Sequence, residues 1–288
     1  MSSSARAADA RPGLALRGRR FTWGERTYVM GIVNATPDSF SGDGLVDPEA
    51  AIARALDFAR GAADIVDVGA ESTRPGSLPV DAAEEVRRLL PVVAGIRARS
   101  HDAVLSIDTY KAGVFRAAHA AGGDVLNCVS GLGDDLLDAA VACAAPVVIM
   151  HNKRVAEYDG DVVDEVLAYL DRNAARAVRA GIPAASVILD PGIGFGKTPE
   201  HNLALLGALP RFPALGFPTL LGTSRKSTLG RLTGRRVADR AAATAATVAL
   251  AVAAKIDIVR VHDAEEMRDV ARVSDAIVRG WRPSGWDL

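Results

Sequence analysis

Residues 187–198 read VILDPGIGFGKT, which places a carboxylate between a short apolar run and a glycine-rich loop. The apolar run from Val187 to Leu189 is typical of a strand that is buried on both faces. Asp190 follows where such a strand leaves the core, and glycines at 192, 194 and 196 let a backbone approach a ligand closely. The segment therefore predicts one edge of a binding site, although a strand followed by a turn with a capping or solvated aspartate also fits it.

Two nucleotide-binding motifs are excluded in this loop. A phosphate-binding loop of the Walker type needs a glycine five residues before Gly196, where the chain has Pro191. The dinucleotide fingerprint needs a third glycine or alanine where the chain has Lys197. The glycines must therefore serve another ligand or a purely structural turn.

Polar side chains follow nearly all of the eight short apolar runs that the chain contains. They are Asn34, Asp67, Asp108, Asn127, His151 (directly after Met150), Asp190, Lys226, Arg260 and His262. Single polar residues after strands are usually caps, but so many of them indicate a common site if the runs are parallel strands of one barrel.

These residues divide into two chemical zones. Asp108, Asn127, Asp190 and Lys226 offer two carboxylates, an amide and an ammonium, which match a flat heterocycle with donors on one edge and acceptors on another. Asn34, Arg74, Arg260 and His262 suit an anion, and the amide oxygen of Asn34 can ligate Mg²⁺. Because barrels of this kind bind phosphate after strands seven and eight, the second zone predicts a phosphorylated substrate.

Several of these residues also have structural alternatives. Arg260 can simply pair with Asp190 or Asp257, and Lys226 can be a solvated loop lysine. Asp67 can support a neighbouring loop, and His151 can be a satisfied histidine at the barrel rim.

The elements that would position these residues alternate regularly. The apolar runs predict strands at 28–33, 65–68, 104–107, 125–126, 147–150, 187–189, 219–221 and 258–261. Helical segments are expected at 48–60, 82–99, 111–121, 136–144, 162–180, 200–209, 239–254 and 264–279. Eight strands that are each followed by a helix predict an α/β fold, a single-domain (β/α)8 TIM barrel; an open doubly wound sheet fits less well.

Length and composition set further bounds. The 288 residues carry 34 Lys plus Arg against 35 Asp plus Glu, so we expect no binding to nucleic acid or membrane. Residues 1–18 contain no secretory signal and are expected to be a disordered tail before a barrel domain at 19–288. Cys128 and Cys143 match no metal-ligand spacing and are interpreted as reduced thiols of a cytoplasmic protein.

The motifs together resemble one enzyme family. They are MGIVNATPDSFS from Met30, DVGAESTRPG from Asp67, SIDT from Ser106, DPGIGFGK from Asp190, SRKS from Ser224 and RVHD from Arg260. In this order, from about residue 28 to 279, they closely resemble dihydropteroate synthase. That family joins 6-hydroxymethyl-7,8-dihydropterin diphosphate to para-aminobenzoate in folate biosynthesis, releasing pyrophosphate and forming 7,8-dihydropteroate.

The resemblance implies a role for each matching residue. Asp108, Asp190 and Lys226 would be catalytic, with the pterin held by these residues, Asn127 and the apolar wall of Met150. The diphosphate would meet Thr73, Arg260, His262 and an Mg²⁺ ion on Asn34. The aminobenzoate would lie among Thr73, Arg74, Pro75, Phe195, Lys226 and Ser227, where sulfonamides compete in this family. The resemblance also implies a homodimer through helices late in the chain.

The match has departures, and two other functions remain open. Cys128 stands where the family usually has Asp, Ala70 where Gly is usual, and the first loop reads Ser-Gly-Asp-Gly from Ser41. These put loop closure and rate in question. A corrinoid-linked methyltransferase on the related barrel is disfavoured by the Ser-Arg-Lys motif, and a non-catalytic pterin-binding paralogue by the diphosphate-facing residues.

Overall fold

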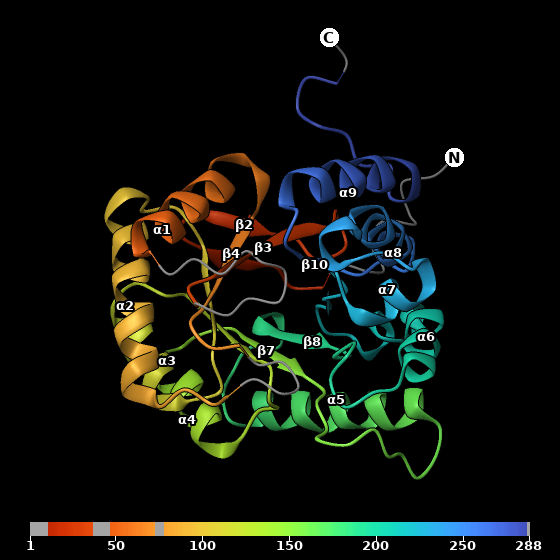
Figure 1. Cartoon of the computed structure of the whole chain (residues 1–288), viewed down its shortest axis with the longest axis horizontal. Coiled ribbons are helices and arrows are strands. Elements are labelled where there is room, and N and C mark those ends of the chain that lie inside the picture. Colours follow the sequence, from red (N-terminus) through yellow and green to blue (C-terminus); the bar gives the residue numbers. More distant parts are fainter. Residues whose placement is uncertain (1–10, 37–46, 73–77, 287–288) are drawn as a thin grey trace.

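Eight parallel strands form a ring that is surrounded by helices in the computed structural model, which describes residues 11–36, 47–72 and 78–286 (Figure 1). The strands are β3 (Tyr28–Asn34), β4 (Ile65–Gly69), β5 (Leu105–Asp108), β6 (Val125–Cys128), β7 (Val147–Met150), β8 (Val187–Asp190), β9 (Leu220–Leu221) and β10 (Ile258–Val261). This arrangement confirms the (β/α)8 barrel that the sequence predicts.

The ring closes between sequence-distant strands. From β3 to β8 each strand pairs with the next one in the chain, and the last strand, β10, pairs in parallel with the first, so that Ile258 lies beside Tyr28. β10 also pairs with β9. The remaining junction, between β8 and β9, is a single bridge from Leu189 to Thr219, supported by the Leu189 N–H bond to the carbonyl of Pro218 at 2.9 Å.

The helices follow the strands and lie outside the ring. They are α1 (Pro48–Asp57), α2 (Ala82–Arg99), α3 (Ala112–Ala120), α4 (Asp134–Ala142), α5 (Val162–Arg179), α6 (Pro199–Gly207), α7 (Ser227–Thr233), α8 (Ala241–Ala253) and α9 (Ala264–Val278). Shorter helical turns are η2 (Phe58–Ala62), η3 (Ala184–Ser186), η4 (Leu209–Arg211), η5 (Pro213–Leu215) and η6 (Val237–Asp239). Helix α7, between strands seven and eight of the ring, was not expected from the sequence.

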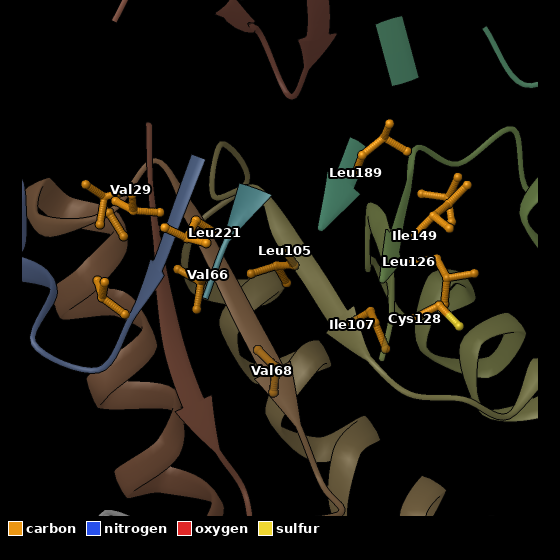
Figure 2. Close-up of a cluster of buried hydrophobic side chains, with 14 of the residues drawn as sticks. Val29, Val66, Val68, Leu105, Ile107, Leu126, Cys128, Ile149, Leu189 and Leu221 are labelled. Atoms are coloured by element: carbon orange, nitrogen blue, oxygen red, sulfur yellow. The ribbon is translucent and has the colours of Figure 1, made fainter. Parts of the chain in front are cut away.

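Strand residues alternate between two apolar layers, because successive side chains point to opposite faces of a strand. One layer faces the helices, and Figure 2 shows part of it, including Val66, Leu105, Leu126 and Ile149. The other layer fills the interior of the ring. Its members are Tyr28, Met30, Ile65, Val104, Val125, Val148, Ile188, Leu220 and Ile258, together with Phe21 and Trp23.

A short antiparallel hairpin closes the amino-terminal end of the barrel. It consists of β1 (Leu14–Leu16) and β2 (Arg19–Phe21). Phe21 and Trp23, which are 1% and 3% exposed, belong to the inner layer, and the Trp23 indole N–H donates to the carbonyl of Ala185 at 3.1 Å. The hairpin thus plugs the end of the barrel opposite the carboxyl ends of the strands.

The prediction of a disordered tail over residues 1–18 is wrong for residues 11–18. Arg11 donates two hydrogen bonds, at 2.8 and 2.7 Å, to the carboxylate of Asp257, which is completely buried before β10. These bonds and the strand β1 order the segment through contacts with the far end of the chain. Residues 1–10 lie outside the described residues.

Candidate active site

The inner face of the barrel changes from apolar to polar toward the carboxyl ends of the strands. Ile188 belongs to the inner layer, so Asp190, two residues later on β8, points to the same side. The same two-residue step leads from Ile258 to Arg260 on β10. It also places Asp67 on β4, Asp108 on β5, Asn127 on β6 and Met150 on β7. The strand-end residues that the sequence singles out therefore converge at one mouth.

Arg260 is the centre of a buried ionic network. Its Nε donates to Asp67 at 2.6 Å, and its Nη2 donates to Asp108 at 2.7 Å. The amide of Asn127 donates to the same Asp67 oxygen at 3.1 Å. Asp67 is completely buried and fixes the side chains of Arg260 and Asn127 at the mouth. Asp67 thus holds two strand side chains and not a neighbouring loop, and the pairing of Arg260 with Asp190 or Asp257 is wrong.

Asp108 keeps one oxygen for a ligand. Its Oδ1 is buried and has no hydrogen-bond partner among the described residues, although its Oδ2 is held by Arg260. Burial raises the pKa of Asp108; Arg260 opposes this effect and Asp67 adds to it. An unpaired buried acceptor is costly, so a ligand N–H at this point would be strongly favoured.

Asp190 opens the glycine-rich loop and is fixed by it. Its Oδ1 accepts the N–H of Gly192 at 2.7 Å. Burial raises the pKa of Asp190, and this bond and the charge of Lys226 oppose the increase. Gly192 has a φ of +69°, and a Cβ there would lie 1.9 Å from the carbonyl oxygen of His151. Glycine is therefore required, because the loop presses against the end of β7.

Lys226 and Phe195 meet across the mouth. The Lys226 Nζ lies 4.1 Å from the centroid of the Phe195 ring, a cation–π distance. A Cβ at Gly194 would be 3.3 Å from Lys226 Cδ, so this glycine leaves room for the lysine. Ser227 follows as the first residue of α7. The alternative of a solvated loop lysine is wrong, since Lys226 is partly buried and its charge acts on both Asp108 and Asp190.

The loops after β9 and β10 are joined at the predicted phosphate zone. The hydroxyl of Ser224 accepts the His262 backbone N–H at 3.1 Å and lies 2.9 Å from His262 Nδ1. Arg225 and Asp263 form a second pair, with Nε and Oδ2 3.1 Å apart. His262 therefore has a fixed ring orientation beside Arg260.

The remaining predicted residues are placed only in part. Met150 is 2% exposed and lies opposite Asp190 in the register of β7 and β8. Asn34 ends β3 and is partly exposed. Thr73, Arg74 and Pro75 lie outside the described residues, as does the departure in the first loop at 41–44.

Lys197 and His151 form a contact that the sequence did not suggest. His151 is 3% exposed, and its Nδ1 lies 2.9 Å from the Lys197 Nζ. In the sequence, Lys197 stands out only where a third glycine would complete a dinucleotide motif and as the last residue of the DPGIGFGK motif. Its position directly after a glycine-rich loop is the one signal that pointed to it.

Acidic and sulfur ligands are not gathered into a metal site, and the helices are too short or too polar to span a bilayer, in the described residues. In residues 11–36, 47–72 and 78–286, no grouping of three or more His, Cys, Asp or Glu side chains is suited to hold a metal ion. No helix in these ranges is long and apolar enough to cross a membrane.

A (β/α)8 barrel with two buried carboxylates, an amide and a lysine at its carboxyl mouth defines an enzyme that binds a flat, hydrogen-bonding heterocycle. The model of the pterin binding enzyme family matches residues 30–262. The chain belongs to this family and, within it, to the dihydropteroate synthases.

The relatives support this assignment over nearly the whole chain. Dihydropteroate synthase of Synechocystis is 40% identical over 282 residues, covering 94% of this chain and 96% of the relative. The Xanthomonas albilineans enzyme, solved with 4-aminobenzoic acid, is 41% identical with a TM-score of 0.86, covering 95% and 100%. The Thermus thermophilus enzyme, solved with 6HMPPP, is 40% identical with a TM-score of 0.81, covering 92% and 100%. The synthase interpretation of the sequence is confirmed.

Proposed function

We propose that the chain condenses 6-hydroxymethyl-7,8-dihydropterin diphosphate with para-aminobenzoate, the reaction of its family, with the roles divided around the barrel mouth. The observation that carries the proposal is the Oδ1 of Asp108, which is buried beside Asn127 on the neighbouring strand and has no hydrogen-bond partner in the described parts of the chain. A pterin ring edge offers the N–H groups that this oxygen and Asp190 accept, and Met150 supplies an apolar wall.

The diphosphate would lie against Arg260 and His262. The Arg260 guanidinium has five N–H donors, of which Asp67 and Asp108 accept two among the described residues. The others remain for phosphate oxygens, and the Ser224 hydroxyl orients His262 toward the same zone. Arg260 thus contacts both Asp108, the carboxylate that binds the pterin, and the diphosphate, which is the leaving group.

The donor set also fits Mg²⁺ at Asn34. Mg²⁺ is usually held by one or two protein oxygens plus substrate phosphates, and a partly exposed amide at the end of β3 without a cage of acidic ligands among the described residues matches this pattern. When bound, the ion would neutralise charge on the diphosphate. Thr73 and the aminobenzoate contacts of Arg74 and Pro75 remain part of the proposal.

The residues then act electrostatically. Arg260 and His262 stabilise the charge that builds on the departing diphosphate. The C–O bond to the diphosphate breaks, and Asp108 and Asp190 stabilise the positive charge left on the pterin methylene. The neutral aryl amine attacks that carbon next to Phe195, Lys226 and Ser227, and the new secondary amine then loses one proton to solvent. No covalent bond to the protein is required.

Pyrophosphate release by the purified protein tests this function. Wild-type protein with the pterin diphosphate and Mg²⁺ is expected to release pyrophosphate only when para-aminobenzoate is present. Lys226→Ala should lower this rate by about 10²-fold. The substitution removes the cation that lies beside Phe195 and near the carboxylates of Asp108 and Asp190. Tight pterin diphosphate binding without aminobenzoate-dependent release would contradict the synthase function and favour the non-catalytic paralogue.

The same assay tests the metal. Treatment with EDTA is expected to stop release, and added Mg²⁺ should restore it. Asn34→Ala should raise the Mg²⁺ concentration needed for half-maximal rate. Full activity after exhaustive chelation would contradict the metal assignment.

The protein is further proposed to be a homodimer of cytoplasmic location, with Cys128 and Cys143 as free thiols. An apolar groove of about 650 Å³ runs between α6, α7 and α8. Leu232 and Leu250 at its edge are 62% and 60% exposed, and Ile277 on α9 is 79% exposed. Exposed apolar side chains around an apolar groove are typical of an interface, and these lie in the late helices that the family resemblance implies.

Light scattering coupled to size exclusion tests the dimer. The wild type should elute as a dimer, whereas Leu250→Glu should shift it to monomer by placing a charge in the apolar interface. Val141→Glu, at a 39% exposed position on α4, is the matched control and should leave the dimer intact. A wild type that is monomeric at all concentrations would contradict the proposal.

A further inference from the structure

Lys197 fastens the loop after β8 to the end of β7. Its Nζ lies 2.9 Å from His151 Nδ1, 3.2 Å from the carbonyl oxygen of His151 and 3.0 Å from the carbonyl oxygen of Phe195. Three acceptors match the three N–H donors of an ammonium group. The side chain therefore bridges two loops that lie far apart in the sequence.

Other contacts press the same two loops together. The His151 N–H donates to the carbonyl of Asp190 at 3.0 Å, and the Tyr158 hydroxyl donates to the carbonyl of Gly196 at 2.9 Å. A Cβ at Gly196 would lie 2.1 Å from the carbonyl oxygen of Lys153. Lys197 differs from these contacts because its side chain bonds to both loops: to His151 after β7 and to the Phe195 carbonyl after β8.

The bridge reaches the proposed aminobenzoate pocket through one residue. Lys197 holds the backbone carbonyl of Phe195, whose ring lies against Lys226. Phe195 lies in a loop with three positive-φ glycines, whose backbone is conformationally permissive. The position of its ring therefore depends on contacts such as the hydrogen bond from Lys197 to the Phe195 carbonyl. A shift of about 1 Å in a positioning contact costs about 10²-fold in rate.

Burial and neighbouring charges shift the pKa of both partners of this bridge. Burial lowers the pKa of Lys197 to about 7, with Asp190 opposing the decrease and Lys226 and Lys153 adding to it. Burial and the Lys197 charge lower the pKa of His151 to about 3, so its ring is neutral and Nδ1 can accept a hydrogen bond from Lys197.

We propose that Lys197 is a positioning residue that fixes Phe195 and thereby sets the affinity of the site for para-aminobenzoate. The inference rests on the proposed function, and it adds to that function a determinant that touches neither substrate. The pterin diphosphate is also held by Asp190 and Met150, at the ends of the two strands that the bridge joins. Its other contacts, Asp108, Asn127 and Arg260, lie on β5, β6 and β10, so its binding should change much less than that of aminobenzoate.

The test is a pair of variants assayed for both substrates. Lys197→Met keeps the length and apolar stem but removes all donors, and is expected to raise the KM for aminobenzoate about tenfold to hundredfold. The KM for pterin diphosphate should change less than about twofold. Lys197→Gln, which keeps two donors on a shorter side chain, should fall between wild type and Lys197→Met, and it decides the matter if the methionine variant does not fold.

Lys153→Met is the matched control. Among the described residues its Nζ contacts the Glu157 carbonyl, the Glu165 carboxylate and, at 4.3 Å, the face of the Tyr158 ring, and none of the residues assigned to either substrate. Lys153→Met leaves the Tyr158 hydroxyl bond to Gly196 in place, so both KM values should remain close to those of wild type. Unchanged KM values in the Lys197 variants, or equal increases for both substrates, would overturn the positioning role. Calorimetric titration of aminobenzoate onto wild type and variants gives the same comparison without turnover, so a failure of the proposed reaction is distinguished from a failure of this inference.

Discussion

Asp108→Asn is expected to lower kcat/KM for pyrophosphate release by about 10²- to 10³-fold. The substitution keeps the size of the side chain but replaces a carboxylate oxygen that has no hydrogen-bond partner among the described residues. It removes the negative charge that stabilises the pterin methylene cation and one acceptor for the ring. Initial rates at several concentrations of both substrates measure the effect, and the thermal midpoint should stay close to that of wild type because Asp67 continues to hold Arg260.

Asp64→Asn is the matched control for this experiment. Asp64 pairs with Arg26 at the opposite end of the barrel and accepts the N–H of Val29 at 2.9 Å. The same chemical change there should leave kcat/KM unchanged. Equal losses in the two variants would show that stability, and not the site, controls the rate, which would contradict the role given to Asp108.

Asp257→Ala is expected to destabilise the protein by about 3–5 kcal/mol, since it removes the charge partner of the partly buried Arg11 and leaves several backbone donors without their acceptor. The carboxylate receives Arg11, the Gly24 N–H at 3.0 Å and the Thr219 N–H at 2.9 Å. It therefore joins the N-terminal segment, the hairpin plug and the junction between β8 and β9. A urea unfolding midpoint and a thermal midpoint measure the loss.

Asp102→Ala provides the comparison on the surface. Asp102 pairs with Arg19 at 3.2 Å, but its side chain is 68% exposed, so solvent screens the pair. Its unfolding midpoint should lie within the spread of wild-type measurements. A similar midpoint for Asp257→Ala would contradict the anchoring role of the buried carboxylate.

The sequence predicted the barrel because each strand is a short apolar run with a helix after it. The bounds of α2 agree residue by residue with those expected from the sequence, Ala82 to Arg99. The hairpin was missed because β1 and β2 have three residues each, too few to show an alternation. Helix α7 was missed because its seven residues follow the Ser-Arg-Lys motif directly and show no helical period of their own.

The site was predictable where it depends on position along a strand. Asp108, Asn127 and Asp190 were identified because parallel strands bring their carboxyl ends together. The pairing of Arg260 with Asp67 could not be predicted, because the two residues are 193 positions apart and no local pattern favours Asp67 over Asp190 or Asp257. The contact of Lys197 with His151 was missed for the same physical reason, because packing between two loops chooses the partner.

The pairing of β10 with β3 has a consequence for how the chain is made (Figure 1). A ribosome releases β3 early, yet its partner emerges only when nearly the whole chain has been translated. Until then β3 presents an unpaired edge, the kind of edge that joins other chains. Asp257, which anchors Arg11, emerges just as late, so the N-terminal hairpin cannot be locked during synthesis. The nascent chain therefore needs protection from aggregation until the last strand is complete.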